Sequence, residues 1–250
     1  MAINVDQITT DITLELDEEV ISIADFQKGT DNFLGLVKEL SKQVAGNNAD
    51  SGEWLVKVYS GSAAVGVMPS AQNLNADKVR EIMISGIRSL ANGIRPGEFS
   101  DKAIECAKSL ASLFKKSSVE PNVRIWSKKE ESIHVVRKVA IEAENILAPA
   151  YEEQGAVEGI LERVDAHGKL QFVIYDVIDD RAVKCEVNES QLQQALENFK
   201  KRVEVVGTVK FRKDGMPVSI KASRIINFPS KSEIPTLAQM RVLLAGGASA

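Results

Sequence analysis

The stretch from Gly155 to Phe228 constrains the fold of this chain more than any other, because it predicts five strands and one helix in close succession. The expected elements are, in chain order, strands over 156–164, 169–176 and 182–187, a helix over 189–199, and strands over 203–211 and 218–226. Asp214-Gly215, between the last two strands, is a strong signal for a tight β-hairpin turn. The helix therefore falls between the third strand and the fourth.

This order of elements resembles the OB-fold, a small five-stranded Greek-key barrel. The resemblance rests on topology and turn chemistry over about a third of the chain, and not on a residue signature. It implies a closed or nearly closed barrel. It implies no particular activity, because one fold hosts many unrelated functions.

The first 150 residues predict an α+β domain, with helices packed on one face of a mainly antiparallel sheet. Ser22, Asn75 and Ser100 each stand where a polar side chain would cap a helix, and 137–147 predicts a fourth helix. The strands are expected over 8–17, 53–59, 63–68, 122–127 and 132–136.

The first of these strands alternates between apolar and polar side chains. Ile12, Leu14 and Leu16 are expected on one side of it. The other side carries Asp11, Thr13 and Glu15. A period of two is typical of a half-buried strand, so we expect the polar side to face solvent.

We therefore expect an α+β chain with an N-terminal α+β domain over 1–150, an OB-like barrel domain over 151–230, and a C-terminal helical extension over 231–250. The layout is similar to that of two-domain bacterial proteins without an assigned function, so this resemblance adds no chemistry. A net charge of −4, ordinary proportions of apolar and charged residues, and two cysteines favour a cytoplasmic protein without a membrane span.

No catalytic, cofactor-binding or metal-binding residues are predicted. His134 and His167 have no second ligand or acidic partner at a useful spacing. Cys106 and Cys185 are expected to be small buried hydrophobic residues and not nucleophiles. The acidic group Asp176, Asp179 and Asp180 is interpreted as a solvated turn, and 60–66 as a hairpin turn and not a phosphate loop.

A basic stripe on the fourth barrel strand is the candidate nucleic-acid surface. Its residues are Lys200, Lys201, Arg202, Lys210, Arg212 and Lys213, with Tyr175 as the candidate for base stacking and Lys184 and Lys221 on the same exterior. The stretch from Gly155 to Phe228 nevertheless has twelve Lys and Arg against eleven Asp and Glu. A solvated face with many ion pairs is the competing interpretation.

The C-terminal extension carries an apolar stripe, formed by Ile234, Leu237, Met240, Leu243 and Leu244. We favour docking of this stripe on the barrel of its own chain, because exposed apolar stripes are uncommon on monomers. The alternative is a helix that fills a groove of a partner protein.

Three functions follow from these patterns. The first is a non-catalytic binding or adaptor protein whose barrel recognises a macromolecule, a protein partner or a second copy ranking before nucleic acid. The second is a nucleic-acid-binding protein that uses the basic stripe. The third is an enzyme whose site is assembled from residues distant in the sequence, in the first domain or at the domain junction.

Overall fold

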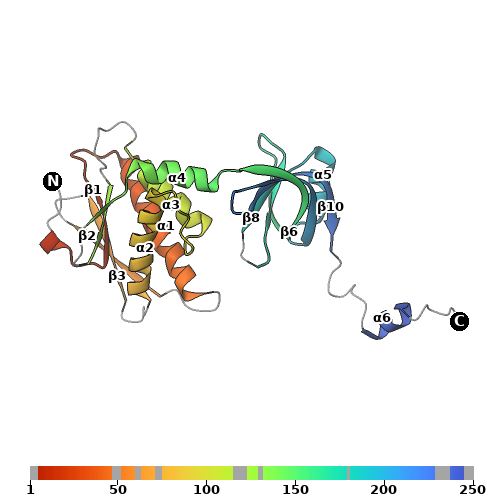
Figure 1. Ribbon diagram of the computed structural model, residues 1–250, viewed down its shortest axis with the longest axis horizontal. Coiled ribbons are helices and arrows are strands. Elements are labelled where there is room, and N and C mark those ends of the chain that lie inside the picture. Colours follow the sequence, from red (N-terminus) through yellow and green to blue (C-terminus); the bar gives the residue numbers. More distant parts are fainter. Residues whose placement is uncertain are drawn as a thin grey trace. The chain divides into compact units, whose positions relative to one another are not determined.

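The computed structural model describes residues 5–46, 52–59, 63–70, 75–114, 123–128, 132–178, 181–228 and 237–244. The chain divides into two compact units, Met1–Ala148 and Pro149–Ala250 (Figure 1). Helices make up 38% and strands 35%, in two sheets, which agrees with the expected mixture of α and β structure. The predicted turns at 60–62 and 179–180 lie outside the described residues.

The first unit contains a five-stranded sheet in the order β2-β3-β1-β4-β5, and all of its pairs are antiparallel. Its strands are β1 (Ile12–Leu16), β2 (Trp54–Tyr59), β3 (Ala64–Pro69), β4 (Val123–Ser127) and β5 (Ile133–His134), and a short 3-10 helix η1 (Val5–Gln7) precedes them. β1 lies at the centre of the sheet, between β3 and β4.

The helices of this unit are α1 (Ile23–Ala45), α2 (Ala76–Ala91), α3 (Asp101–Ala111) and α4 (Arg137–Leu147). The Ser22 hydroxyl accepts a hydrogen bond from the Asp25 amide at 3.0 Å, and the Ser100 hydroxyl accepts one from the Ala103 amide at 3.1 Å. Both predicted caps are thus confirmed. Asn75 occupies the cap position of α2, but its side chain makes no capping hydrogen bond.

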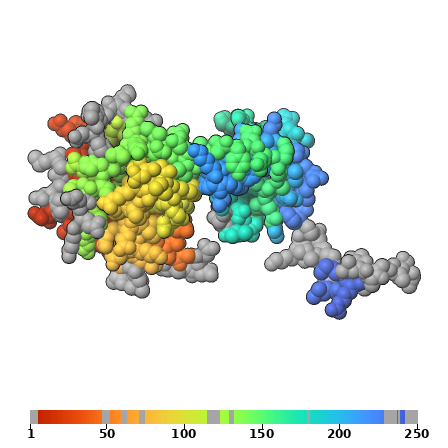
Figure 2. Space-filling model, viewed as in Figure 1, coloured from red at the N-terminus to blue at the C-terminus, as the bar shows by residue number. Residues whose placement is uncertain are grey.

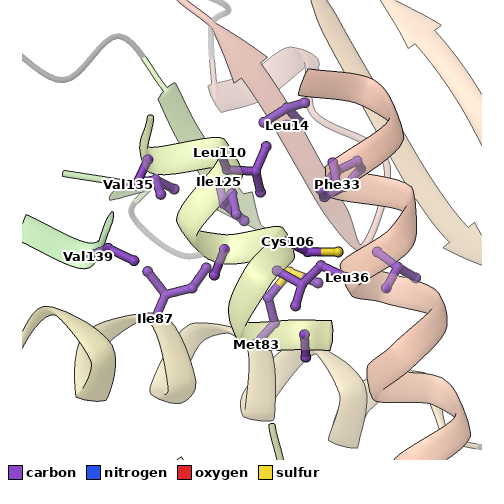
Figure 3. Packing of buried hydrophobic residues seen from close by; sticks show 14 of the residues in the cluster. Leu14, Phe33, Leu36, Met83, Ile87, Cys106, Leu110, Ile125, Val135 and Val139 are labelled. Atoms are coloured by element: carbon purple, nitrogen blue, oxygen red, sulfur yellow. The ribbon is translucent and has the colours of Figure 1, made fainter. Parts of the chain in front are cut away.

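The core of this unit forms where the four helices meet one face of the sheet. Figure 3 shows Leu14 and Ile125 of the sheet near Phe33 of α1 and Leu110 of α3. Cys106 of α3 lies in the same cluster and is 8% exposed. Its burial raises the pKa of the thiol, an effect strengthened by Glu39 and Glu105 and opposed by Lys102. The interpretation of Cys106 as a buried hydrophobic residue is confirmed.

The second unit has the predicted order of three strands, a helix and two strands. These elements are β6 (Tyr151–Asp165), β7 (Gln171–Tyr175), β8 (Ala182–Glu186), α5 (Glu189–Glu197), β9 (Arg202–Phe211) and β10 (Pro217–Asn227), and a further helix α6 (Leu237–Leu244) follows. The strands pair in the ring β10-β8-β7-β6-β9, and β10 completes it by lying antiparallel to β9 and parallel to β8. Cys185 points into the apolar interior of this ring and is fully buried, which raises the pKa of its thiol.

Two glycines face each other on the β6–β9 ladder, Gly155 and Gly207. A Cβ atom on Gly207 would lie 3.0 Å from the Lys221 carbonyl carbon and 3.1 Å from the Ala222 Cα, and closer still to the Lys221 carbonyl oxygen. All three atoms belong to the backbone of β10, which cannot rotate away. A Cβ atom on Gly155 would meet only Val209 Cγ2, at 3.5 Å, an ordinary contact.

We therefore predict that Gly207→Ala lowers the free energy of unfolding of the barrel by roughly 1 to 3 kcal/mol, because the methyl group forces β9 and β10 apart. Gly155→Ala is the matched control, on the facing strand, and should leave stability nearly unchanged. Chemical denaturation followed by circular dichroism compares the two variants with the wild type. Equal stability of the two variants would contradict the close approach of β10 to Gly207.

Candidate functional surfaces

Three basic side chains of the predicted stripe lie next to carboxylates of β6. Lys210 Nζ lies 3.3 Å from Glu152 Oε1, and Lys200 Nζ lies 3.8 Å from Glu162 Oε1. The Arg202 guanidinium makes a close ion pair with Glu158. Three of the six cations in the predicted stripe thus have an acidic partner within the barrel.

This pairing follows from the register of β6 against β9. Glu152 stands directly opposite Lys210, and Arg202 stands opposite Ile160, two positions from Glu158. Side chains that are directly or diagonally opposite on one face of an antiparallel pair are within reach of each other. Figure 2 shows the surface of β6, in green, bordering that of the later strands, in blue. The competing interpretation, a face with many ion pairs, describes this part of the stripe.

The other predicted residues of the stripe differ in their exposure to solvent. Arg212 is only 6% exposed, so the expectation that it lies on an open basic face is wrong. It follows the end of β9, where the alternation of the strand no longer determines which way a side chain points. Lys201 and Lys213 are exposed. Tyr175 is half-buried at the end of β7 and stands between Ile160 and Ala182 of the neighbouring strands.

Two further exposed lysines lie near Lys210, because Ser219 of β10 stands between Lys210 of β9 and Lys184 of β8, and Lys221 lies two residues after Ser219. Lys184 of β8 is opposite Ser219 of β10, and Lys221 is opposite Glu186, so the two lysines lie on adjacent strands. Among the residues that the structure describes, no carboxylate lies within ion-pair distance of either ammonium group. They are the better candidates for contact with an anionic ligand.

Apolar side chains are exposed on the same unit, at the end of α5. Leu196, in the last turn of the helix, is 51% exposed, and Phe199, two residues after its end, is 46% exposed. The helix is short and packs against β6, β7 and β10 mainly through Ala195, which is fully buried. Lys200 Nζ lies 5.9 Å from the centre of the Phe199 ring.

The predicted apolar stripe of the C-terminal extension is described only in part. Leu237 and Met240 of α6 are 74% and 38% exposed. Ile234 and the side chains of Leu243 and Leu244 lie outside the described residues. Docking of the stripe on its own barrel is not supported by the exposure of Leu237, and a partner groove stays a hypothesis.

A polar cluster in the first unit was not predicted. The Tyr59 hydroxyl accepts hydrogen bonds from the backbone amides of Thr9 and Thr10, at 3.1 and 3.2 Å, and shares a third, at 2.7 Å, with the Thr10 hydroxyl. Thr10 Oγ1 in turn lies 2.6 Å from Thr13 Oγ1 and fills the space that a Cβ atom on Gly66 would need. This network holds the residues before β1 against the sheet face opposite the helices.

A buried carboxylate lies on the same face of the sheet. Glu15 is 1% exposed; its Oε2 accepts a hydrogen bond from the Trp126 indole at 2.8 Å and lies 3.7 Å from the Arg124 guanidinium. Arg124 also pairs with Asp17, at 2.7 Å. The expectation that Thr13 and Glu15 face solvent is wrong, because β1 is the central strand and both of its faces are covered.

Among the described residues, no three His, Cys, Asp or Glu side chains gather in a way that could hold a metal ion. Within the same ranges, no helix is long and apolar enough to cross a lipid bilayer. His134 is exposed on β5 and His167 on the turn after β6. No protein-family model matches the chain, and no curated protein matches it either.

The hydrogen bonds of Tyr59 predict an unusual titration. Burial alone would raise the pKa of this phenol, but the donors on Thr10 and Thr9 together outweigh it and lower the pKa below the ordinary value of about 10. Between the lowered pKa and that of the unfolded chain, the unfolded state binds more protons, so the phenolate adds stability as pH rises through this window. Below the folded-state pKa this contribution is absent.

We predict that tyrosinate absorbance of the folded protein contains one transition below the ordinary tyrosine range, and that Tyr59→Phe removes it. Tyr175→Phe is the control and should leave that transition in place. An early transition that survives in Tyr59→Phe would contradict the assignment to the amide-bound hydroxyl.

Proposed function

We propose that the chain is a non-catalytic binding or adaptor protein whose barrel, of the OB type, recognises a macromolecular partner, with protein ranking before nucleic acid. The observation that carries this proposal is a contrast on the second unit. Lys200, Arg202 and Lys210 are each paired with a carboxylate of β6, while Leu196 and Phe199 are about half exposed.

The OB type is supported by the order and pairing of the elements. The helix stands between the third strand and the fourth, and the first strand, β6, pairs with both the second and the fourth. The parallel pair β8–β10 closes the ring. A five-stranded Greek-key barrel has these features.

A protein partner is supported by the kind of side chain that is exposed. Aromatic residues are enriched at protein interfaces, and a few buried aromatic anchors usually supply most of the binding free energy. Phe199, Leu196 three positions before it, and Lys200 above the ring form a small amphipathic patch. Charge pairs such as Lys210–Glu152 contribute little attraction to a polyanion, because each cation is already neutralised.

A non-catalytic role is supported by the state of both thiols. Reactive cysteines have lowered pKa values and accessible sulfur atoms. Cys106 and Cys185 are both buried, and burial raises the pKa of each.

The alternative, nucleic-acid binding, is favoured by one observation. Lys184 and Lys221 are exposed on adjacent strands, without a carboxylate in ion-pair distance among the described residues. Two such cations could contact a phosphate backbone. Ser219 stands opposite both Lys184 and Lys210, so this surface adjoins the Lys210 end of the stripe that the sequence indicated.

The main proposal predicts that the α5 patch is needed for partner capture. The double variant Leu196→Asp with Phe199→Asp should lose a protein that co-purifies with the wild type from extract of the source organism. Loss of one anchor typically costs about 2 kcal/mol or more. Ile94→Asp, at an exposed apolar position of the first unit, is the control and should retain the protein. Equal capture by the wild type and the double variant would contradict the proposal.

The alternative predicts a different pattern in mobility-shift titrations with labelled nucleic acid. Lys184→Glu with Lys221→Glu should weaken binding more than Lys210→Glu with Lys200→Glu, since the second pair already has carboxylate partners. Equal or reversed effects would reject these two lysines as the contact surface.

A further inference from the structure

We infer that the edge strand β2 of the first unit pairs with β2 of a second copy of this chain, and so continues the sheet across a two-fold axis at Val56. The inference concerns a different unit from the proposed function and does not depend on it.

β2 lies at one edge of the sheet and is hydrogen-bonded to β3 alone among the described strands. Six consecutive residue pairs, from Trp54↔Pro69 to Tyr59↔Ala64, join the two strands without a register shift. The backbone of β2 is therefore regular, and its outer N–H and C=O groups are spaced to accept another strand.

Three common protections of an edge strand are missing from the described residues of β2. Such strands commonly carry proline, a bulge or an outward lysine. β2 has no proline and no bulge, and its single charged residue, Lys57, is held by its own chain. Lys57 Nζ lies 2.7 Å from the Thr9 hydroxyl and 5.1 Å from the centre of the Tyr59 ring.

The apolar side chains of β2 are exposed on both faces. Val56 and Val58 share one face and are 53% and 70% exposed, while Leu55 on the other face is 47% exposed. An open edge with apolar side chains on both faces is a site for strand addition. A strand docked there would cover these three side chains as well as pair the backbone.

A second copy fits this edge because the strand is complementary to itself. A two-fold axis perpendicular to the sheet keeps each side chain on its own face, so only residues of one face can stand opposite each other. With the axis at Val56, the two Val56 residues are opposite each other, Trp54 is opposite Val58, and Leu55 is opposite Lys57. Aromatic and β-branched residues make favourable cross-strand pairs.

Charge repulsion favours the register with the axis at Val56 over the register with the axis at Lys57. With the axis at Lys57, two ammonium groups would stand directly opposite each other, which destabilises a strand pair. Two six-residue strands bury less than the ~1,200 Å² of a standard interface. We therefore expect a dimer that forms and dissociates with concentration and not a permanent one.

The first test is disulfide cross-linking of Val56→Cys. Residues directly opposite each other on antiparallel strands have Cα atoms within the range that a disulfide spans. Under mild oxidation this variant should form a covalent dimer of the 27.3 kDa chain. Val58→Cys, opposite Trp54 in the pair, is the matched control and should stay monomeric. Cys106 and Cys185 are buried and do not compete.

The second test is sedimentation velocity across a range of concentrations. The wild type should show a sedimentation coefficient that rises with concentration, and Val56→Lys should lose this rise because two ammonium groups then face each other. Ile141→Lys, at an exposed position of α4, should keep it. Circular dichroism checks that both variants are folded.

Three results would overturn the inference. They are a wild type that is monomeric at every concentration, a dimer that persists in Val56→Lys, and cross-linking of Val58→Cys as efficient as that of Val56→Cys.

Discussion

The barrel depends on the antiparallel pairing of β6 with β9, which runs without a shift from Tyr151↔Phe211 to Ile160↔Arg202. β6 also pairs with β7, so one long strand holds both sides of the ring together. Gly207 of this ladder also pairs with Ala222 of β10, where the β10 backbone leaves no room for a Cβ atom. The β6–β9 ladder also places Glu152 opposite Lys210 and Glu158 near Arg202, so the register that forms the barrel also pairs these two cations with carboxylates.

Because the β6–β9 ladder both forms the barrel and pairs its cations with carboxylates, it limits how strongly the second unit can attract a polyanion. Cations that are matched one to one with carboxylates stabilise a surface modestly and attract a polyanion weakly. By contrast, the apolar side chains of Leu196 and Phe199 at the end of α5 remain about half exposed to solvent. A protein partner is therefore favoured, and any residual attraction for anions is assigned to Lys184 of β8 and Lys221 of β10.

Local signals in the sequence predicted local structure well. Asp214-Gly215 forms the expected turn, with Gly215 at a φ of 80° and its amide bonded to the Arg212 carbonyl. Ser22 and Ser100 cap their helices because a cap needs only neighbours three residues away. The order of strands and helix in the second unit was likewise readable from alternation and turn residues.

What the sequence did not predict depends on contacts between distant segments. Alternation distinguishes the two faces of β1 but not what covers each one, so the burial of Glu15 beside Trp126 was missed. The ion pairs of the barrel depend on the register of β6 against β9, which no local pattern encodes.

The most direct test is fluorescence polarisation of the full chain with labelled single-stranded DNA and RNA, from low to physiological salt. The account predicts no binding at physiological salt, whereas binding that survives it would contradict the neutralised strand.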